Sequence, residues 1–232
     1  MSTIINKNKT KCAVFDLDGT LLNTIKTINH YLNLALSSHN LPSVSEADCM
    51  SFVGNGAKKL IERALDRVEA DRTLFDEVFS TYNEAYNSSP YYLTEPYEGI
   101  IDLLDNLRAR GIKLAVLSNK PDFATKAAVR HFFGDNFDLV LGGRENIPLK
   151  PSPEALHEIM RDLSVTTEQT VYIGDSEVDV ITAKNAGIEN AIFVTYGFRT
   201  KEQLNLAGAA AMVNSAIELL AFINNVDICQ LL

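Results

Sequence analysis

The sequence predicts an α/β protein: a Rossmann-like core, in which helices cover both faces of a parallel sheet, with a small all-α cap domain inserted after the first strand. Two observations support this fold class. Over most of the chain, short apolar segments typical of buried strands alternate with segments of helical periodicity. One long stretch near the N-terminus interrupts this alternation and contains only helical patterns. Strand–helix alternation is typical of a parallel sheet covered on both faces.

The expected strands are short apolar runs, because a strand buried on both faces of a parallel sheet is hydrophobic at nearly every position. The first run lies at residues 12–14. Four further runs and a weaker fifth follow at residues 112–117, 137–141, 171–173, 191–194 and 210–213. Segments of helical periodicity lie between or beside them at residues 99–110, 122–133, 153–163, 179–186 and 201–206.

The stretch that interrupts the alternation spans residues 21–89 and carries no strand signal. Apolar residues recur at helical spacing across residues 21–36, which predicts a first helix. A second helix is expected to begin at Ser45, where Asp48 completes a capping-box signal. Two more helical patterns follow at residues 57–68 and 73–86.

These patterns predict two domains. The α/β core is expected to comprise residues 1–20 and 94–232, and the helical cap residues 21–93. Two linkers would join the cap to the core, and this arrangement suits a lid that opens and closes over a site.

Composition limits the partners. The 232 residues carry a net charge of −9 and have an estimated pI of 4.9, which disfavours binding to nucleic acid or to an anionic membrane. Apolar runs are too short to span a bilayer, and the N-terminus lacks the apolar stretch of a signal peptide. Cys12, Cys49 and Cys229 form neither a metal-ligand spacing nor a disulfide framework. We expect a cytoplasmic protein with reduced thiols; the sequence does not determine its oligomeric state.

Two carboxylates follow the first strand directly. Asp16 and Asp18 lie in the segment Phe-Asp-Leu-Asp-Gly-Thr, residues 15–20. This pattern could be an ordinary turn, because Asp and Gly are common turn residues. An EF-hand loop does not fit, since Gly19 is fourth from Asp16 where the loop needs Gly at position six, and Thr27 occupies the position of the terminal Glu. Two close carboxylates repel, so they require a cation, a shared proton or both.

Other expected strands also end in polar residues. Ser118 and Asn119 end the second expected strand of the core, Lys150 precedes the helix expected at residues 153–163, and Asp175 and Asp179 follow the strand at residues 171–173. In a parallel sheet these positions converge on one edge, where ligands of open α/β sheets bind. Each has a simpler explanation as a helix cap, a solvated lysine or a turn. Their occurrence together, in this order, favours a common site.

The chemistry of this set indicates a metal. Four carboxylates (Asp16, Asp18, Asp175, Asp179) and one lysine (Lys150) leave three negative charges, which one divalent cation would reduce to one. Carboxylates packed together without a cation would repel strongly. Because all the expected ligands are oxygen atoms, Mg²⁺ is the cofactor that fits.

The motifs at residues 16–20, 118–119, 150–151 and 174–179 resemble the four motifs of the haloacid dehalogenase-like hydrolase superfamily. The resemblance covers nearly the whole chain, and the helical insert has the position of that superfamily's helical cap. Within the superfamily, the chain is most similar to the phosphoglycolate phosphatase branch. Further segments that resemble this branch lie at residues 52–57, 195–199, 207–209 and 213–215.

The resemblance implies roles for the acidic residues. Asp16 would be the nucleophile that forms an aspartyl-phosphate. Asp18 would protonate the leaving oxygen and then activate water. Mg²⁺ would be held by the carboxylates of Asp16 and Asp175 and by the backbone carbonyl of Asp18. Asp179 would support the ion indirectly, through its water or through Lys150.

The resemblance also implies a phosphate-binding set. Ser118, the backbone of Asn119 and Lys150 would hold the phosphoryl oxygens and offset charge in the transition state. Gly19 and Thr20 would lie against the phosphate, because a residue without a side chain lets the backbone approach closely.

The cap offers candidates for substrate specificity. Gly54, Asn55 and Gly56 form either a simple turn before a helix or a loop that faces the active site. In the second case its backbone N–H groups, with Lys58 or Lys59, would meet a substrate carboxylate.

Three other features have structural explanations. Asn23 and Thr24 stand where many relatives have Asp-Ser, and Asn23 can still cap the first cap helix. We expect Arg199 to be a solvated arginine. The tyrosines at positions 82, 86, 91, 92 and 97 are expected to pack in the core and between cap and core.

The resulting prediction is a Mg²⁺-dependent phosphatase of a small phosphorylated metabolite, with 2-phosphoglycolate as the best candidate. Alternatives on the same fold are a phosphomutase of the β-phosphoglucomutase type and a pyrophosphatase. Retention of Asp18 argues against dehalogenase and phosphonatase activity but is compatible with a mutase. A non-catalytic phosphate-binding protein is the third alternative, although none of the motif residues is missing.

Overall fold

The computed structural model describes residues 10–224. The expectations for the N-terminal nine residues and for Cys229 lie outside this range. Within it, Cys12 and Cys49 are buried free thiols. No helix in residues 10–224 combines the length and the apolar character that a membrane span requires.

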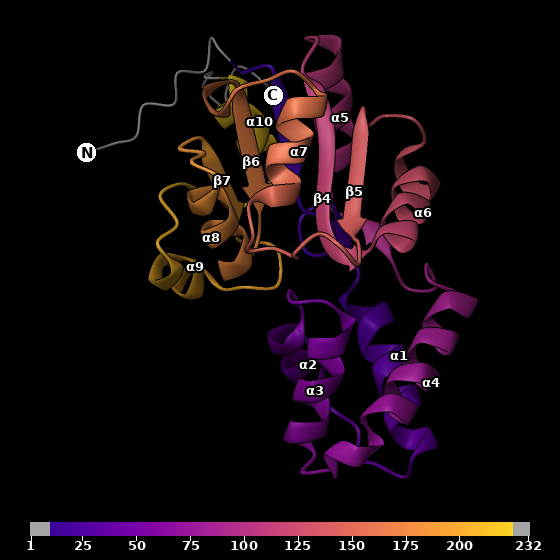
Figure 1. Ribbon diagram of the computed structural model, residues 1–232. Coiled ribbons are helices and arrows are strands. Elements are labelled where there is room, and N and C mark those ends of the chain that lie inside the picture. The colour runs from indigo at the N-terminus through magenta and orange to yellow at the C-terminus, as the bar shows by residue number, and fades with distance from the viewer. Residues whose placement is uncertain (1–9, 225–232) are drawn as a thin grey trace.

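A six-stranded, fully parallel sheet forms the core and confirms the predicted α/β fold (Figure 1). Its strand order is β5-β4-β1-β6-β7-β8, so the first strand in sequence lies at the centre. The strands are β1 (Cys12–Phe15), β4 (Lys113–Pro121), β5 (Leu139–Gly143), β6 (Thr170–Gly174), β7 (Ala191–Val194) and β8 (Met212–Val213).

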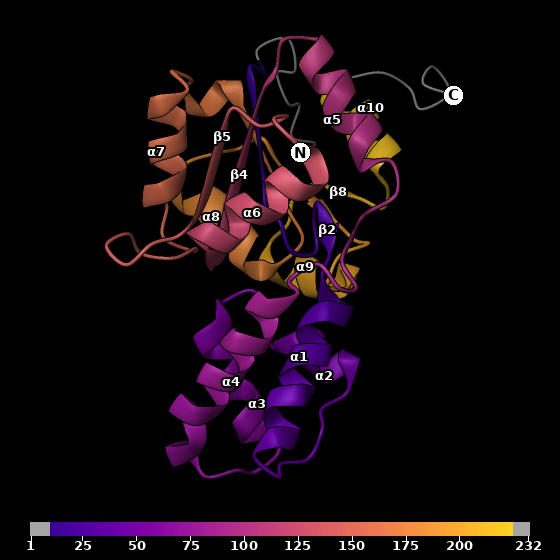
Figure 2. The same ribbon diagram turned by 90° about the vertical axis from the view of Figure 1, so that its right-hand side faces the viewer.

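Helices cover both faces of the sheet, as Figures 1 and 2 show. Side chains of a strand alternate between faces, so Ala13 and Phe15 join one hydrophobic cluster while Cys12 and Val14 join the other. The first cluster packs against α5 (Ile100–Ala109), α6 (Asp122–Phe133) and α10 (Ala216–Asn224). The second packs against α7 (Glu154–Asp162), α8 (Glu177–Asn185) and α9 (Lys201–Ala207).

Four helices form a separate bundle, the cap, next to the carboxyl ends of the strands (Figure 1). They are α1 (Ile25–Ser38), α2 (Glu46–Phe52), α3 (Ala57–Arg67) and α4 (Phe75–Ser88), with a short 3₁₀ turn at Arg72–Leu74. Their apolar faces make a third hydrophobic cluster, which includes Leu32, Ile61 and Val78. As predicted, Ser45 and Asp48 form a capping box at the start of α2.

Two very short strands join the cap to the core. β2 (Leu22–Asn23) pairs with β3 (Glu95–Pro96) in antiparallel orientation, which brings the start and the end of the insert together. No sequence pattern indicated these strands, because two-residue strands have no periodicity to detect. They lie within two residues of the expected boundaries at 20/21 and 93/94, although the division into domains stays a prediction.

Two sequence-based expectations were incomplete or wrong. Helix α10 was not predicted. The residue that precedes α1 is Thr24, which makes no side-chain capping bond, and Asn23 lies in β2 instead of capping the helix. The pairing of Asn23 with Glu95 explains this, since it holds Asn23 in a strand.

Candidate active site

The carboxyl ends of β1 and β6 bring three carboxylates together. Asp16 follows β1, Asp175 follows β6, and Asp179 lies in the first turn of α8. Oxygen atoms of the three residues lie within 4.8 Å of one another, and all three residues are buried. β1 and β6 are hydrogen-bonded neighbours in parallel register, so their ends coincide at one edge of the sheet.

Lys150 bridges two of these carboxylates. Its Nζ atom lies 2.7 Å from Oδ1 of Asp16 and 2.8 Å from Oδ1 of Asp179, and its side chain is almost fully buried. Burial disfavours the charged form, but Asp16 and Asp179 outweigh this effect and raise the pKa of Lys150 well above its ordinary value. Lys150 is therefore a fixed positive charge beside Asp16.

Both oxygen atoms of Asp179 are engaged by protein donors. One accepts from Lys150 and from the hydroxyl of Tyr172 at 2.8 Å each, and the other accepts from the Ser176 hydroxyl at 2.6 Å and backbone N–H at 3.1 Å. Burial favours the neutral form, yet Lys150 and these donors hold the pKa of Asp179 below its ordinary value. Asp179 thus fixes Lys150 and the start of α8, in keeping with an indirect role.

Fewer hydrogen-bond donors offset the negative charge of Asp175 than that of Asp179. It accepts a hydrogen bond from the Phe198 backbone N–H at 2.7 Å and from the Thr20 hydroxyl at 3.3 Å. Burial, followed by the nearby Asp179 and Asp16, raises the pKa of Asp175 well above its ordinary value. Burial likewise raises the pKa of Asp16 to about 7. The cluster therefore holds more negative charge than the protein itself neutralises.

This excess of charge fits a divalent cation. The site contains four carboxylates and two ammonium groups, which leaves two negative charges (Asp16, Asp18, Asp175 and Asp179 against Lys120 and Lys150). Lys120 is the second ammonium group and was not counted from the sequence. All the candidate ligand atoms are oxygens, which suit hard cations.

Gly19 and Thr20 lie against Asp175. A Cβ atom on Gly19 would lie 2.3 Å from Oδ2 of Asp175, and the φ angle of Gly19 is +92°. Thr20 is fully buried and donates its hydroxyl to Asp175. Neither residue is among those that line the cavity described below. Their clearest structural role is to make room for Asp175 and to orient it.

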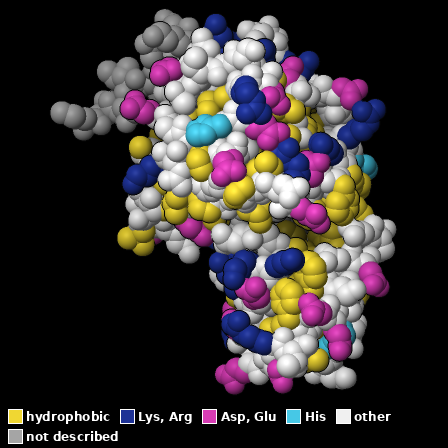
Figure 3. Space-filling model, viewed as in Figure 1, with side chains coloured by type: hydrophobic (Ala, Val, Ile, Leu, Met, Phe, Trp, Pro, Cys, Tyr) yellow, Lys and Arg dark blue, Asp and Glu magenta, His cyan; other side chains and the backbone are white. Residues whose placement is uncertain are grey.

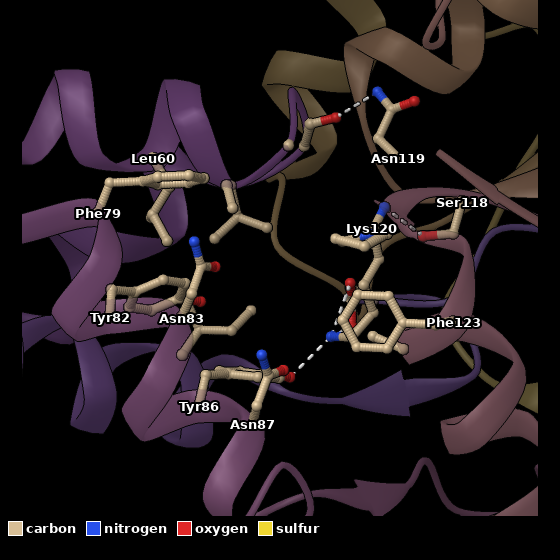
Figure 4. A pocket seen from close by; sticks show the side chains of 18 of the residues that line it. Leu60, Phe79, Tyr82, Asn83, Tyr86, Asn87, Ser118, Asn119, Lys120 and Phe123 are labelled. Atoms are coloured by element: carbon tan, nitrogen blue, oxygen red, sulfur yellow. Dashed lines mark hydrogen bonds and ion pairs between the residues drawn. The ribbon is translucent and has the colours of Figure 1, made fainter. Parts of the chain in front are cut away.

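Asp18 lies apart from the carboxylate cluster and pairs with Lys120. Its Oδ1 atom is 3.2 Å from Nζ of Lys120, which also donates to the hydroxyl of Tyr86 at 2.7 Å (Figure 4). The sequence motifs assign no role to Lys120. The available signal was a cation directly after Ser118 and Asn119 at the same strand end.

A cavity of about 370 Å³ lies between the core and the cap, and Asp16, Asp18 and Lys150 are part of its wall. The surface in Figure 3 is hollowed where the core meets the cap, and hydrophobic side chains border the hollow. The core lines the cavity with Asp16, Asp18, Ser118, Asn119, Lys120, Pro121, Phe123, Ala124 and Lys150. The cap contributes mainly apolar, tyrosine and asparagine side chains, several of which are labelled in Figure 4.

Ser118 and Asn119 differ in their availability. Ser118 lines the cavity and accepts a hydrogen bond from the backbone N–H of Lys120 at 3.2 Å. No acceptor for its hydroxyl hydrogen lies within residues 10–224, so this hydrogen can be donated to a ligand. The Asn119 side chain donates to the carbonyls of Gly54 and Lys150, at 2.9 Å each, and accepts from the Lys150 N–H at 2.8 Å. A contact between Asn119 and phosphate therefore depends on its backbone, as expected.

The loop before α3 faces the core. Gly54 and Gly56 line the cavity, and Gly54 accepts the hydrogen bond from Asn119. The side chain of Asn55 instead accepts a hydrogen bond from Arg63 within the cap, at 2.8 Å. The loop is thus both a turn before a helix and part of the cavity wall.

Lys58 and Lys59 are exposed and are not among the residues that line the cavity. Lys59 pairs with Glu62 on the same helix. The largest share of the cap wall comes from α4, which contributes Phe79, Tyr82, Asn83, Tyr86 and Asn87. The candidates for contact between the cap and a substrate are therefore the polar side chains of α4 and not the lysines of α3.

Arg199 is buried, so the expectation of a solvated arginine was wrong. Only 6% of it is exposed, and it donates to Glu177 at 2.7 Å and to the carbonyls of Met50 and Val53 at 2.6 and 2.8 Å. The neighbouring Phe198 inserts its side chain into the cap's hydrophobic cluster. The sequence could not reveal this because the two carbonyl acceptors lie at the end of α2, far away in the chain.

Comparison with known proteins defines the class. The chain belongs to the haloacid dehalogenase-like hydrolases, whose family model matches residues 13–193. It is an enzyme of the phosphoric monoester hydrolase type, which confirms the resemblance recognised in the sequence.

Several relatives are named phosphoglycolate phosphatase. A phosphoglycolate phosphatase of Colwellia psychrerythraea is 34% identical over 213 residues, which covers 89% of this chain and 94% of the relative. One of Rhodospirillum rubrum is 34% identical over 209 residues, with 87% and 86% covered. A solved structure from Lactobacillus delbrueckii subsp. bulgaricus, provisionally named a phosphoglycolate phosphatase, has a TM-score of 0.89 and 33% identity over 93% of this chain and 98% of that one.

Proposed function

We propose that the protein is a Mg²⁺-dependent phosphatase that hydrolyses a small phosphomonoester, with 2-phosphoglycolate as the preferred substrate, through an aspartyl-phosphate on Asp16. The observation that carries the proposal is the placement of Asp16 and Asp18 together on the cavity wall, with Lys150 2.7 Å from Asp16. The names of the relatives support the choice of substrate.

In the first step Asp16 would attack the phosphorus atom and displace the alcohol. One of its oxygens is held by Lys150, which orients the carboxylate and leaves the other oxygen for the attack. Charge that develops on the phosphoryl oxygens would be offset by the Lys150 ammonium and by the Ser118 hydroxyl.

Asp18 would supply the acid–base chemistry. As an acid it would protonate the leaving oxygen; as a base it would then deprotonate the water that attacks the phosphoryl group on Asp16. Its position two residues after Asp16 places both carboxyl groups on the same cavity.

The buried carboxylates would hold the metal. Asp16 and Asp175, with the backbone carbonyl of Asp18, would bind Mg²⁺, which supplies electrostatic stabilisation of the transferring phosphoryl group. Asp179 would act through Lys150, because its own oxygens already accept four hydrogen bonds.

The test is phosphate release from a panel of phosphorylated metabolites, with Mg²⁺ and then with excess EDTA. Turnover that needs Mg²⁺ and favours 2-phosphoglycolate over sugar phosphates, nucleotides and pyrophosphate would support the proposal. A different preferred ester would retain the mechanism and reject the substrate. Isomerised sugar phosphate would instead indicate a mutase, and pyrophosphate consumption a pyrophosphatase.

The variant Asp16→Asn tests the mechanism. It should remain folded and lose turnover by roughly four orders of magnitude or more, as expected when a covalent nucleophile is removed. Near-normal turnover in this variant would contradict the assignment of Asp16.

A further inference from the structure

A lysine and a tyrosine from opposite walls meet inside the cavity. Lys120 belongs to β4 of the core and Tyr86 to α4 of the cap, and the Lys120 ammonium donates to the Tyr86 hydroxyl at 2.7 Å (Figure 4). Both residues line the cavity, and the Lys120 side chain is only 10% exposed. The contact joins the core wall and the cap wall of the cavity beside Asp18.

This pair retains unused donors. An ammonium group has three N–H donors. Within residues 10–224, one N–H of Lys120 serves the Asp18 carboxylate as a bifurcated bond to its two oxygens, at 3.2 and 3.5 Å, and a second serves the Tyr86 hydroxyl. The Tyr86 oxygen accepts from Lys120, and the described part of the chain supplies no acceptor for its own hydrogen. Burial raises the pKa of Tyr86, so its hydroxyl stays protonated. One N–H and one O–H therefore remain for a ligand.

The other buried cations near the cavity are already committed. Among the lining residues that the structure describes, Lys120 and Lys150 are the only cations. Lys150 is paired with Asp16 and Asp179. Arg199 does not line the cavity, and its guanidinium donates hydrogen bonds to Glu177 and to two carbonyl oxygens of the cap. Lys120 is paired with one carboxylate, that of Asp18, whereas Lys150 is paired with two, so Lys120 is the lining cation with more positive charge left for a second anionic group of a substrate.

We propose that Lys120 and Tyr86 form the binding site for a second anionic group, a carboxylate, on the substrate's non-phosphoryl part. This inference rests on the proposed phosphatase function and deepens it. A carboxylate that accepts from both donors would sit beside Asp18, next to the leaving oxygen. Because one donor belongs to the core and the other to the cap, such a substrate would also favour the closed arrangement in which the two meet.

The proposal predicts selection between two esters of similar size. In 2-hydroxyethyl phosphate, a neutral CH₂OH group replaces the carboxylate of 2-phosphoglycolate. The measured quantity is the ratio of kcat/KM for 2-phosphoglycolate to kcat/KM for 2-hydroxyethyl phosphate. Lys120 also holds Asp18, so Lys120→Met should slow both reactions; the ratio cancels that common loss.

Lys120→Met should lower the ratio by roughly 30-fold or more, because a charge-assisted hydrogen bond to the carboxylate is lost. Tyr86→Phe removes a neutral donor and should lower it about three- to tenfold, chiefly through KM. Lys120→Arg keeps the positive charge and should recover part of the ratio. Thermal unfolding of each variant shows that it is folded.

Lys58→Met and Lys59→Met serve as the comparison, since both lysines are cationic cap residues outside the cavity lining. A fall of the ratio in these variants but not in Lys120→Met would overturn the proposal. So would a parallel loss of both rates in Lys120→Met with an unchanged ratio, which would make Lys120 only a support for Asp18. A wild-type enzyme that hydrolyses both esters equally would reject this inference alone; no phosphate release from any ester would reject the phosphatase itself.

Discussion

The guanidinium of Arg199 donates a hydrogen bond of 2.8 Å to the carbonyl oxygen of Val53, across 146 positions of sequence. The bond joins the loop after β7 to the cap loop that lines the cavity. The residue before Arg199, Phe198, donates its backbone N–H to Asp175 and packs its ring in the cap. One short loop therefore contacts the cap and the carboxylate cluster together.

Arg199→Met should loosen the cap loop. The change removes bonds to two backbone carbonyls and leaves Glu177, whose side chain is 41% exposed, without its partner. We expect a loss of about 1–3 kcal/mol in the free energy of unfolding, measured in urea, and a higher KM. Arg72→Met is the control, because the pair of Arg72 with Asp66 is exposed and should contribute little. Equal effects of the two substitutions would contradict the linking role of Arg199.

Gly19→Ala should weaken Mg²⁺ binding at the proposed metal site. Its Cβ atom would lie 2.3 Å from Asp175 Oδ2, and the φ angle of +92° is strained for alanine. Backbone strain alone costs about 1–3 kcal/mol. Gly187→Ala separates the two effects, since Gly187 has φ of +71° but no atom within 4 Å of its Cβ position. Urea unfolding should show a loss of stability in both variants, and a Mg²⁺ titration should show weakened ion binding in Gly19→Ala only. Normal Mg²⁺ affinity in Gly19→Ala would disprove the steric argument.

Mg²⁺ should stabilise the protein more at pH 8 than at pH 5.5. In the ion-free protein, burial raises the pKa of Asp16 to about 7, and that of Asp175 is also raised. The folded state then binds more protons than the unfolded state between about pH 4 and 7, so stability falls as the pH rises through this range. A cation requires the deprotonated carboxylates and displaces those protons.

Differential scanning calorimetry measures this effect. At Mg²⁺ a hundredfold above its Kd, the expected gain at pH 8 is about 2.7 kcal/mol, or roughly 5–10 °C in Tm for a protein of this size. The gain should shrink at pH 5.5. Asp175→Asn should lose most of it at both pH values, and an undiminished shift in that variant would exclude Asp175 as a ligand.

Cys12 and Cys49 should resist thiol reagents in the native protein. Burial raises the pKa of each thiol to about 12, so the nucleophilic thiolate is scarce at pH 8. In a Cys229→Ser background, Ellman's reagent should label neither thiol until urea unfolds the chain. Rapid labelling of the native protein would show that the β1 or α2 region opens readily.

The sequence was sufficient for the elements that repeat a simple pattern. The parallel sheet could be predicted because each strand, from Cys12 of β1 to Val194 of β7, is a short apolar run beside an amphipathic helix. The position of the cap could be predicted because strand signals stop after β1. Helix α10 and strands β2 and β3 were missed, since their patterns are weak or only two residues long.

The sequence by itself also determined which groups gather at the sheet edge. Asp16 and Asp175 directly follow parallel strands, Ser118 lies near the end of β4, and Lys150 lies in the loop between β5 and α7. Parallel strands bring their carboxyl ends to one side. Only the tertiary structure decided how the cap meets this edge. Lys120 with Tyr86 and Arg199 with Val53 are contacts between two separately packed units. Such contacts depend on the relative placement of the units, which local periodicity does not encode.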